Sequence, residues 1–277
     1  MTEPLLRVDN LAISFPSDAG PVAIVKSISF EVGREIVALV GESGSGKSMT
    51  GRAIMGLLPR RAMVSASQLT LDGRDLQKLT PSGWNRIRGN GMGLILQDPK
   101  FSLNPAHRVG RQVEEALLLH TRLSSAERRN QALEMLRKVG LDDAERVYQS
   151  YPAALSGGMG QRVMIASMLI NRPGLIIADE PTSALDRQLQ DQILTLLRSL
   201  THELGMSLLL ISHDLQQVSR YADRVLVMRK GEIVDRLAAS ALSDAQSPYT
   251  RGLWAARPSA VTYGTHLPTV EAEGVRR

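Results

Sequence analysis

The chain has 277 residues with a formal net charge of +5, and 43% of them are hydrophobic, enough for the core of one or two α/β domains. It contains no cysteine, which excludes disulfides, thiol nucleophiles and cysteine-bound metal centres, and its five histidines are too scattered to suggest a transition-metal site. Its basic residues are dispersed and not interleaved with aromatics, so a nucleic-acid partner is not expected.

Neither the beginning of the sequence nor its apolar runs point to export or to a membrane span. The first six residues lack the basic-then-apolar pattern of a signal peptide. No uninterrupted apolar run approaches the length that a bilayer requires. We therefore expect the chain to stay in the cytosol.

Two strands are predicted before the first glycine-rich loop. Residues 6–15 and 24–32 alternate between apolar and polar, and a turn cluster at 16–21 separates them. They suggest an antiparallel flap. Phe15 ends the first strand, where its ring could stack on an adenine or belong to the core, and the sequence leaves both open.

A phosphate-binding loop follows the buried strand predicted at 36–40 and precedes a helix predicted at 49–58. Its sequence matches G-x-x-x-x-G-K-[ST], in which glycines let backbone N–H groups point at phosphate oxygens. Lys47 would reach the β- and γ-phosphates, and the Ser48 hydroxyl would hold Mg²⁺. The residues predicted to contact the nucleotide are Gly41, Glu42, Ser43, Gly44, Ser45, Gly46, Lys47, Ser48 and Met49.

Strands alternate with helices in the rest of the chain, which predicts a parallel sheet with ligand groups at the carboxyl ends of its strands. A helical insert at about 105–150 includes a capping box, Ser124 to Glu127, and is expected to form a subdomain of its own. The tail from Ala255 is polar and expected to pack loosely. Residues 69–74 are predicted to form a strand and a tight turn. The other predicted strands are 93–97, 175–178, 207–211 and 224–228, and the other predicted helices are 187–204 and 214–221.

Four polar residues at the ends of predicted strands fit a phosphate chemistry. Asp179 can hold Mg²⁺, and Glu180 can accept a proton from the water that attacks the γ-phosphate. His213 could contact the γ-phosphate or hold that water in line. Gln97 could sense Mg²⁺ and the water and link the site to the insert that follows it.

A second anion-binding helix start lies at Leu155–Arg162, more than a hundred residues from the first loop. One nucleotide does not easily need two such loops from one chain. Two chains arranged head to tail would use both loops, because the second loop of each chain would cover the nucleotide bound by the other chain. The residues expected to act on the partner's nucleotide are Ser156, Gly157, Gly158 and Gln161.

These motifs together resemble those of the ATP-binding cassette ATPases, over roughly residues 5–240. In that family's terms they are similar to Walker A (41–48), the Q-loop (Gln97), the signature (155–161), Walker B (175–180), the D-loop (183–186) and the H-loop (His213). The resemblance implies a RecA-like P-loop core at 1–254 with a helical subdomain at about 100–165. It also implies ATP hydrolysis with Mg²⁺ at two composite sites of a dimer, with Asp186 communicating between them.

Two further stretches resemble the peptide and nickel importers of this family. Residues 97–105 match Q-D-P-x-x-S-L-N-P, and Ser247–Leu253 is similar to a C-terminal H-P-Y-T-R-x-L element. The chain lacks the cysteine cluster that many peptide-importer ATPases carry, which slightly favours nickel or a metal chelate over peptides. Gly160 also departs from the family, where Arg, Lys or Gln is commoner.

The expected function is therefore the ATPase subunit of an importer, peripheral on the cytoplasmic face of a bacterial inner membrane. The resemblance implies two integral membrane permease subunits and, indirectly, an extracytoplasmic substrate-binding protein. It favours a sister ATPase as the dimer partner, with a second copy of this chain as the other possibility. An ATPase of the same type acting on nucleic acid or ribosomes is the alternative, but it tends to show a coiled-coil insertion or two cassettes. A small-molecule kinase would leave residues 155–161 and His213 unexplained.

Overall fold

The computed structural model describes residues 3–256, 270–271 and 274–275. The chain forms two compact units: the first comprises Met1–Gln77 and Leu209–Arg277, and the second comprises Lys78–Leu208. Within the described residues, no helix combines the length and the apolar character needed to cross a bilayer. Most of the expected tail, 255–277, lies outside the described residues.

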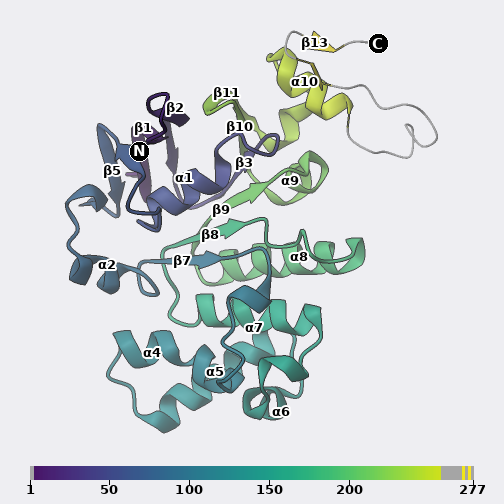
Figure 1. Cartoon of the computed structure of the whole chain (residues 1–277). Helices are drawn as coiled ribbons and strands as arrows, with labels where there is room; N and C mark the ends of the chain where they lie inside the picture. Colours follow the sequence, from purple (N-terminus) through teal and green to yellow (C-terminus); the bar gives the residue numbers. More distant parts are fainter. Residues whose placement is uncertain (1–2, 257–269, 272–273, 276–277) are drawn as a thin grey trace. The chain divides into compact units, whose positions relative to one another are not determined.

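The first unit begins with an antiparallel sheet, which confirms the predicted flap (Figure 1). β1 and β2 pair from Leu6 with Val32 to Phe15 with Val22. The alternation of β1 changes phase at Asn10, whose φ of +52° accompanies a register shift. As a result, buried side chains occur in β1 both before and after Asn10. The strands are β1 (Leu6–Phe15), β2 (Val22–Val32), β4 (Met63–Ser65), β5 (Gln68–Leu71) and β6 (Arg74–Asp75).

A second, mainly parallel sheet in the first unit carries the phosphate loop. β3 (Ile36–Val40) is buried throughout and pairs in parallel with β10 (Arg224–Arg229). β10 turns through Lys230 and Gly231 into the antiparallel β11 (Glu232–Ala238). β9 (Ser207–Ser212) lies next to β3 on its other side. The remaining elements of this unit are α1 (Lys47–Ile54), α9 (Leu215–Tyr221), α10 (Pro248–Ala255), and the short strands β12 (Val270–Glu271) and β13 (Gly274–Val275).

The second unit contains two parallel strands and a group of helices. β7 (Met92–Ile95) pairs with β8 (Leu175–Asp179), and the apolar residues of both strands are mostly buried. α7 (Gly157–Leu169) packs on β7 and contacts α8 (Arg187–Glu203), while α3, α4 and α5 pack on α7 (Figure 1). Its other helices are α2 (Pro81–Ile87), α3 (Val109–Val113), α4 (Glu115–His120), α5 (Ser125–Lys138) and α6 (Ala144–Gln149). β9 (Ser207–Ser212) begins in this unit and ends in the first.

Candidate functional site

The loop from Gly41 to Ser48 joins β3 to α1, where the motif predicted it. Gly41, Gly44 and Gly46 have φ angles of +149°, +79° and +105°, which favour residues without a Cβ. At Gly41 a Cβ would also lie only 2.1 Å from the carbonyl oxygen of Met228 in β10. The loop therefore lies directly against the end of that strand, and glycine is required there.

Lys47 is buried at the start of α1, with 5% of its surface exposed. Its ammonium donates hydrogen bonds to the carbonyl oxygens of Gly41, at 2.8 Å, and Glu42, at 2.9 Å. Buried charges are costly unless they are hydrogen-bonded, so these contacts stabilise the lysine inside its own loop. The ammonium is thus directed toward the backbone of the loop.

Two serines give the loop further polar groups. The carbonyl of Ser45 accepts a hydrogen bond from the N–H of Gly231, at 3.1 Å. The Ser45 hydroxyl is buried and has no hydrogen-bond partner among the described residues. Ser48 is half-buried in the first turn of α1, a turn that contains no acidic residue. An anion is favoured at such a helix start because its N–H groups and dipole are positive.

Phe15 lies half-buried at the end of β1. The guanidinium carbon of Arg61 lies 5.8 Å from the centroid of its ring. The ring is thus only partly covered, unlike Leu11 and Ile13 of the same strand, which are fully buried. Stacking on adenine remains a prediction.

His213 follows β9 directly and is exposed, in the same unit as the phosphate loop. The next residue, Asp214, caps α9 by accepting hydrogen bonds from the N–H groups of Gln216, at 2.8 Å, and Gln217, at 3.0 Å. Its own N–H donates to the hydroxyl of Ser212, at 3.0 Å. His213 is therefore held between a strand end and a capped helix.

Gln97, Asp179 and Glu180 lie at the carboxyl end of the β7–β8 pair. Ile95 stands opposite Ala178, so Gln97 and Glu180 each follow that pair by two residues. Gln97 is exposed, whereas only 8% of the surface of Asp179 is exposed. The parallel strands thus bring the predicted amide and carboxylates of this unit to the same end.

Glu180 has a φ of +48°, which is uncommon for a residue with a Cβ. The turn after it is closed by Ser183, whose N–H and hydroxyl donate to the Glu180 carbonyl at 3.3 and 3.1 Å. Strained backbone of this kind persists where the surroundings over-determine it, and it clusters at active sites. The turn therefore fixes the direction in which the Glu180 side chain leaves the strand.

The second glycine-rich stretch begins α7, and Ser156 caps it by accepting a hydrogen bond from the N–H of Met159, at 3.3 Å. Ser156 and Gly157 are exposed and Gly158 is half-buried. Gln161 differs, because it is fully buried and its side-chain amide donates to the carbonyl of Pro181, in the turn after Glu180. It therefore lies inside its own unit, away from the surface that Ser156 occupies.

Asp186 is exposed and caps α8, accepting a hydrogen bond from the N–H of Leu189 at 3.0 Å. Gly160, which departs from the family pattern, is buried, and a Cβ there would lie 3.4 Å from Pro99. A long side chain at this position would have to pass that proline. The capping role of Asp186 is local, and a role between two sites stays a prediction.

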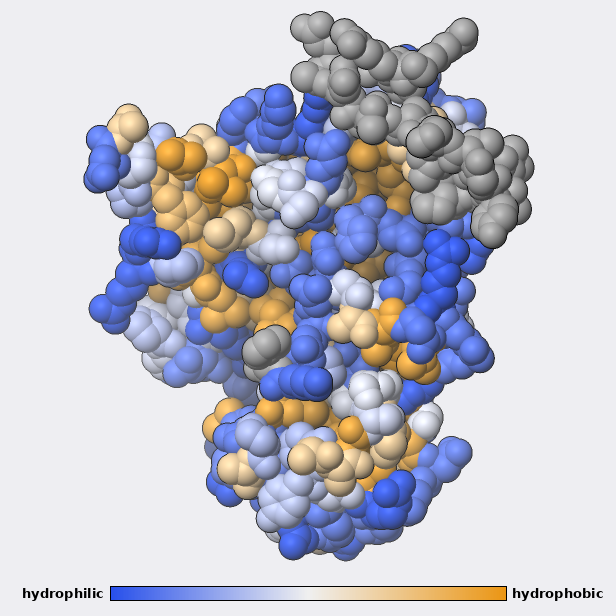
Figure 2. Space-filling view, turned by 45° about the vertical axis from the view of Figure 1, so that its right-hand side comes forward, coloured by the Kyte–Doolittle hydropathy of each residue, from blue (hydrophilic) through white to orange (hydrophobic). Residues whose placement is uncertain are grey.

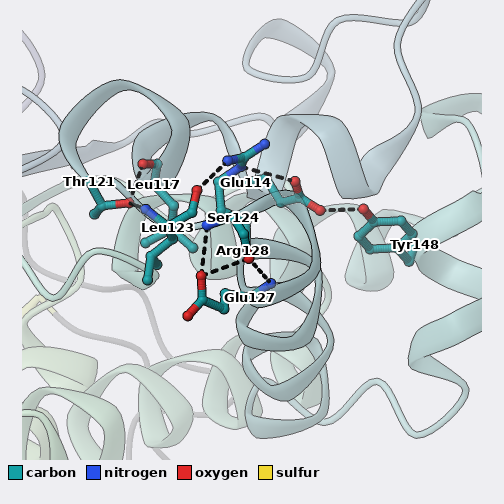
Figure 3. A network of polar contacts seen from close by, with 8 residues as sticks. All are labelled: Glu114, Leu117, Thr121, Leu123, Ser124, Glu127, Arg128 and Tyr148. Atoms are coloured by element: carbon teal, nitrogen blue, oxygen red, sulfur yellow. Dashed lines mark hydrogen bonds and ion pairs between the residues drawn. The ribbon is translucent and has the colours of Figure 1, made fainter.

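A polar network braces the helices of the second unit (Figure 3). Glu114, between α3 and α4, accepts a hydrogen bond from the hydroxyl of Tyr148 in α6 and lies 3.6 Å from Nε of Arg128 in α5. Ser124 and Glu127 form the predicted capping box at the start of α5. Burial, followed by the hydrogen bond to Glu114, raises the pKa of Tyr148 to about 12.

One contact of the phosphate loop was not predicted from the sequence. The hydroxyl of Tyr249, in the C-terminal helix α10, accepts a hydrogen bond from the N–H of Glu42 at 3.3 Å. The signal that could have found it is the stretch Ser247–Leu253, which matched an importer element but suggested no role. A contact between residues so distant in the chain leaves no local pattern.

Comparison with known proteins identifies relatives over nearly the whole chain. A family model described as ABC transporter matches residues 25–183. The peptidoglycan transport ATP-binding protein YejF of Agrobacterium fabrum is 46% identical over 93% of this chain, which spans only 48% of that protein. A putative peptide import ATP-binding protein of Brucella abortus is 43% identical, over 97% of this chain and 82% of that protein. The dipeptide transport ATP-binding protein DppD of Escherichia coli is also 43% identical, over 92% and 78%.

A solved structure has the same fold. It is the dimeric structure of a post-hydrolysis state of the ATP-binding cassette MJ0796, bound to ADP and Pi. Its TM-score is 0.74 and its sequence identity 28%, over 84% of this chain and 98% of that one. The α/β fold, with a mainly parallel sheet and an antiparallel sheet, is therefore that of a known nucleotide-binding cassette.

Proposed function

The chain belongs to the ABC transporter family, and we propose that it is the ATP-hydrolysing subunit of a bacterial peptide importer. The observation that carries this proposal is the loop 41–48, built around positive-φ glycines and a buried lysine. The relatives named for peptide transport, which match almost the entire chain, support the coupling of this loop to import.

We propose peptides as the cargo, although the absence of a cysteine cluster slightly favoured nickel or a metal chelate. The Brucella and Escherichia relatives are named for peptide and dipeptide transport, and the Agrobacterium relative for peptidoglycan transport. Both uptake classes share the match at 97–105, so that stretch does not separate them. The degree of identity to peptide proteins therefore outweighs the absence of a cysteine cluster.

In this proposal Gly41–Met49 bind the phosphates of ATP and Phe15 stacks on its adenine. Glu180 takes the proton of the attacking water, and its strained turn supports a fixed direction of approach. His213, exposed after β9, donates to the γ-phosphate, and Gln97 orients the water.

The donor set of the chain fits Mg²⁺. We assign the ion to the oxygen atoms of Ser48, Gln97 and Asp179, because Mg²⁺ prefers hydroxyl, amide and carboxylate oxygens. The unsatisfied buried hydroxyl of Ser45 supports a polar ligand at the same loop. When bound, Mg²⁺ neutralises charge on the phosphates.

The exposed start of α7 supports a dimer in which Ser156, Gly157 and Gly158 contact the partner's nucleotide. MJ0796 has been solved as a dimer with ADP and Pi, which agrees with this arrangement. Asp186 would communicate between the two sites. Gln161 is buried, and we place its role inside its own chain. A sister ATPase is the favoured partner.

The helical insert is the proposed contact with two membrane permease subunits, with residues 98–105 at its edge. Leu118 and Leu119 of α4 are 58% and 69% exposed, and Tyr151 is 46% exposed. Figure 2 shows apolar residues (orange) reaching the surface among polar ones. Exposed apolar residues of this size suit a protein interface. The chain would thus lie on the cytoplasmic face of the inner membrane, served by an extracytoplasmic substrate-binding protein.

Co-purification of the tagged chain from its native membranes tests this proposal. We expect two hydrophobic permeases and a sister ATPase, together with a receptor that binds short peptides and not nickel. Recovery of ribosomes or DNA-repair proteins from the soluble fraction, with no permease, would instead support an ATPase acting on nucleic acid. Nickel binding by the recovered receptor would contradict peptides as the cargo but would leave the importer ATPase function intact.

A further inference from the structure

The C-terminal helix α10 reaches the phosphate loop through Tyr249. This residue is buried, with 5% of its surface exposed, and its hydroxyl accepts a hydrogen bond from the N–H of Glu42 at 3.3 Å. The guanidinium carbon of Arg229, at the end of β10, lies 4.7 Å from the centroid of its ring. The tyrosine is thus held in place by packing and by a cation–π contact.

The peptide that Tyr249 contacts is the one that Lys47 contacts. The N–H of Glu42 and the C=O of Gly41 belong to a single planar peptide unit. Its N–H donates to Tyr249, and its C=O accepts from the Lys47 ammonium at 2.8 Å. Rotation of this plane would therefore move both hydrogen bonds together.

The surroundings of Gly41 explain why this peptide can be held so closely. A Cβ at Gly41 would lie 2.1 Å from the carbonyl oxygen of Met228, so only glycine lets the loop approach β10. The next residue of β10, Arg229, is the one that contacts the ring of Tyr249. The end of β10 thus contacts both the loop and the side chain that fixes it.

We propose that Tyr249 is a positioning residue for nucleotide binding, which sets the place of the Lys47 ammonium through the Gly41–Glu42 peptide. This rests on the proposed binding of ATP by the same loop. Without the hydroxyl, the N–H of Glu42 loses a partner in a part-buried place, and the peptide plane is then held by hydrogen bonding from its carbonyl side only. The carbonyl of Gly41 then directs the lysine toward the phosphates less strictly.

The test is Tyr249→Phe in the full chain, with Tyr151→Phe as matched control because that tyrosine is exposed and lies in the other unit. Dissociation constants for a non-hydrolysable ATP analogue, tripolyphosphate and AMP are measured by competition with a fluorescent nucleotide. We expect the first two to rise by the same factor, about three- to tenfold for one lost hydrogen bond. AMP lacks the phosphates that Lys47 reaches, so its constant should not change.

Unchanged affinity for the ATP analogue would overturn the proposal. An equal loss of affinity for AMP would also overturn it, as would a loss of affinity that is accompanied by a lower melting temperature of the variant. Those last results would assign Tyr249 a purely structural role. If Tyr249→Phe does not fold, Arg229→Gln is tested in the same way and should show the same selectivity for the longer phosphates. Failure of the unaltered chain to bind ATP would contradict the proposed function itself.

Discussion

The side-chain amide of Gln161 donates a hydrogen bond to the backbone carbonyl of Pro181. Gln161 lies on α7, whose start is the second glycine-rich stretch, and Pro181 follows the carboxylates at the end of β8. The bond therefore connects the helix that we expect to face the partner's nucleotide with the turn that holds Glu180. It lies wholly within the second unit.

Gln161→Leu keeps the volume of the side chain but removes this bond. We expect turnover to fall more than nucleotide affinity, because the turn that orients Glu180 loses a fixed point. The free energy of unfolding should fall by about 1–3 kcal/mol, since the Pro181 carbonyl loses a buried partner. Steady-state kinetics, nucleotide titration and urea unfolding measure the three quantities, with the exposed Gln131→Leu as control. Equal losses of turnover and affinity would contradict a role through Glu180.

Glu180→Gln keeps the shape of the side chain and removes the proton acceptor. ATP binding should persist, while turnover falls by about 10²- to 10⁴-fold, the usual contribution of a general base. The variant should also accumulate as a closed dimer on ATP, detectable by size-exclusion chromatography. Glu134→Gln, on an exposed face of α5, is the control. A normal rate of hydrolysis in Glu180→Gln would show that another group is the base.

Lys47→Ala removes the charge that the loop directs toward phosphate. Hydrogen bonds to charged groups contribute about 1.5–3 kcal/mol, so we expect the dissociation constant for ATP to rise about 10- to 100-fold. Isothermal titration calorimetry checks this, with Lys138→Ala as a control in the other unit. An unchanged dissociation constant would count against the assignment of the loop.

Tyr148→Phe should change how stability depends on alkaline pH. Burial and the hydrogen bond to Glu114 raise the pKa of Tyr148 to about 12, above its ordinary value of 10.0. The folded chain therefore holds this proton more tightly than the unfolded chain, and the resulting stability is complete below about pH 10 and lost toward pH 12. Between these values the free energy of unfolding should fall more steeply in the unaltered chain than in the variant. Parallel curves from urea unfolding would contradict this.

Many of the elements could be predicted because their signals are local. The continuous apolar runs at 36–40 and 175–178, and the alternation at 6–15, gave strands close to those observed. α1 was less well predicted, since it begins at Lys47 and ends at Ile54, before Gly56 with its φ of +62°. A glycine that permits a left-handed backbone ends a helix more effectively than apolar periodicity extends it.

The candidate site was predicted as a set of strand ends and helix starts. Gln97 and Glu180 lie at the same end of the sheet because β7 and β8 are neighbouring parallel strands. The burial of Gln161 and the contact of Tyr249 were not predicted. Both depend on packing between segments distant in sequence, where a polar residue can equally well face solvent.

The two carbonyl contacts of Lys47 have a consequence for nucleotide exchange. Each catalytic cycle includes an interval between the departure of ADP and the arrival of ATP, when a lysine without a partner would be a buried, uncompensated charge. The carbonyls of Gly41 and Glu42 continue to accept hydrogen bonds from the ammonium in that interval. The lysine therefore keeps its place when the product leaves, and the loop does not have to refold before the next turnover.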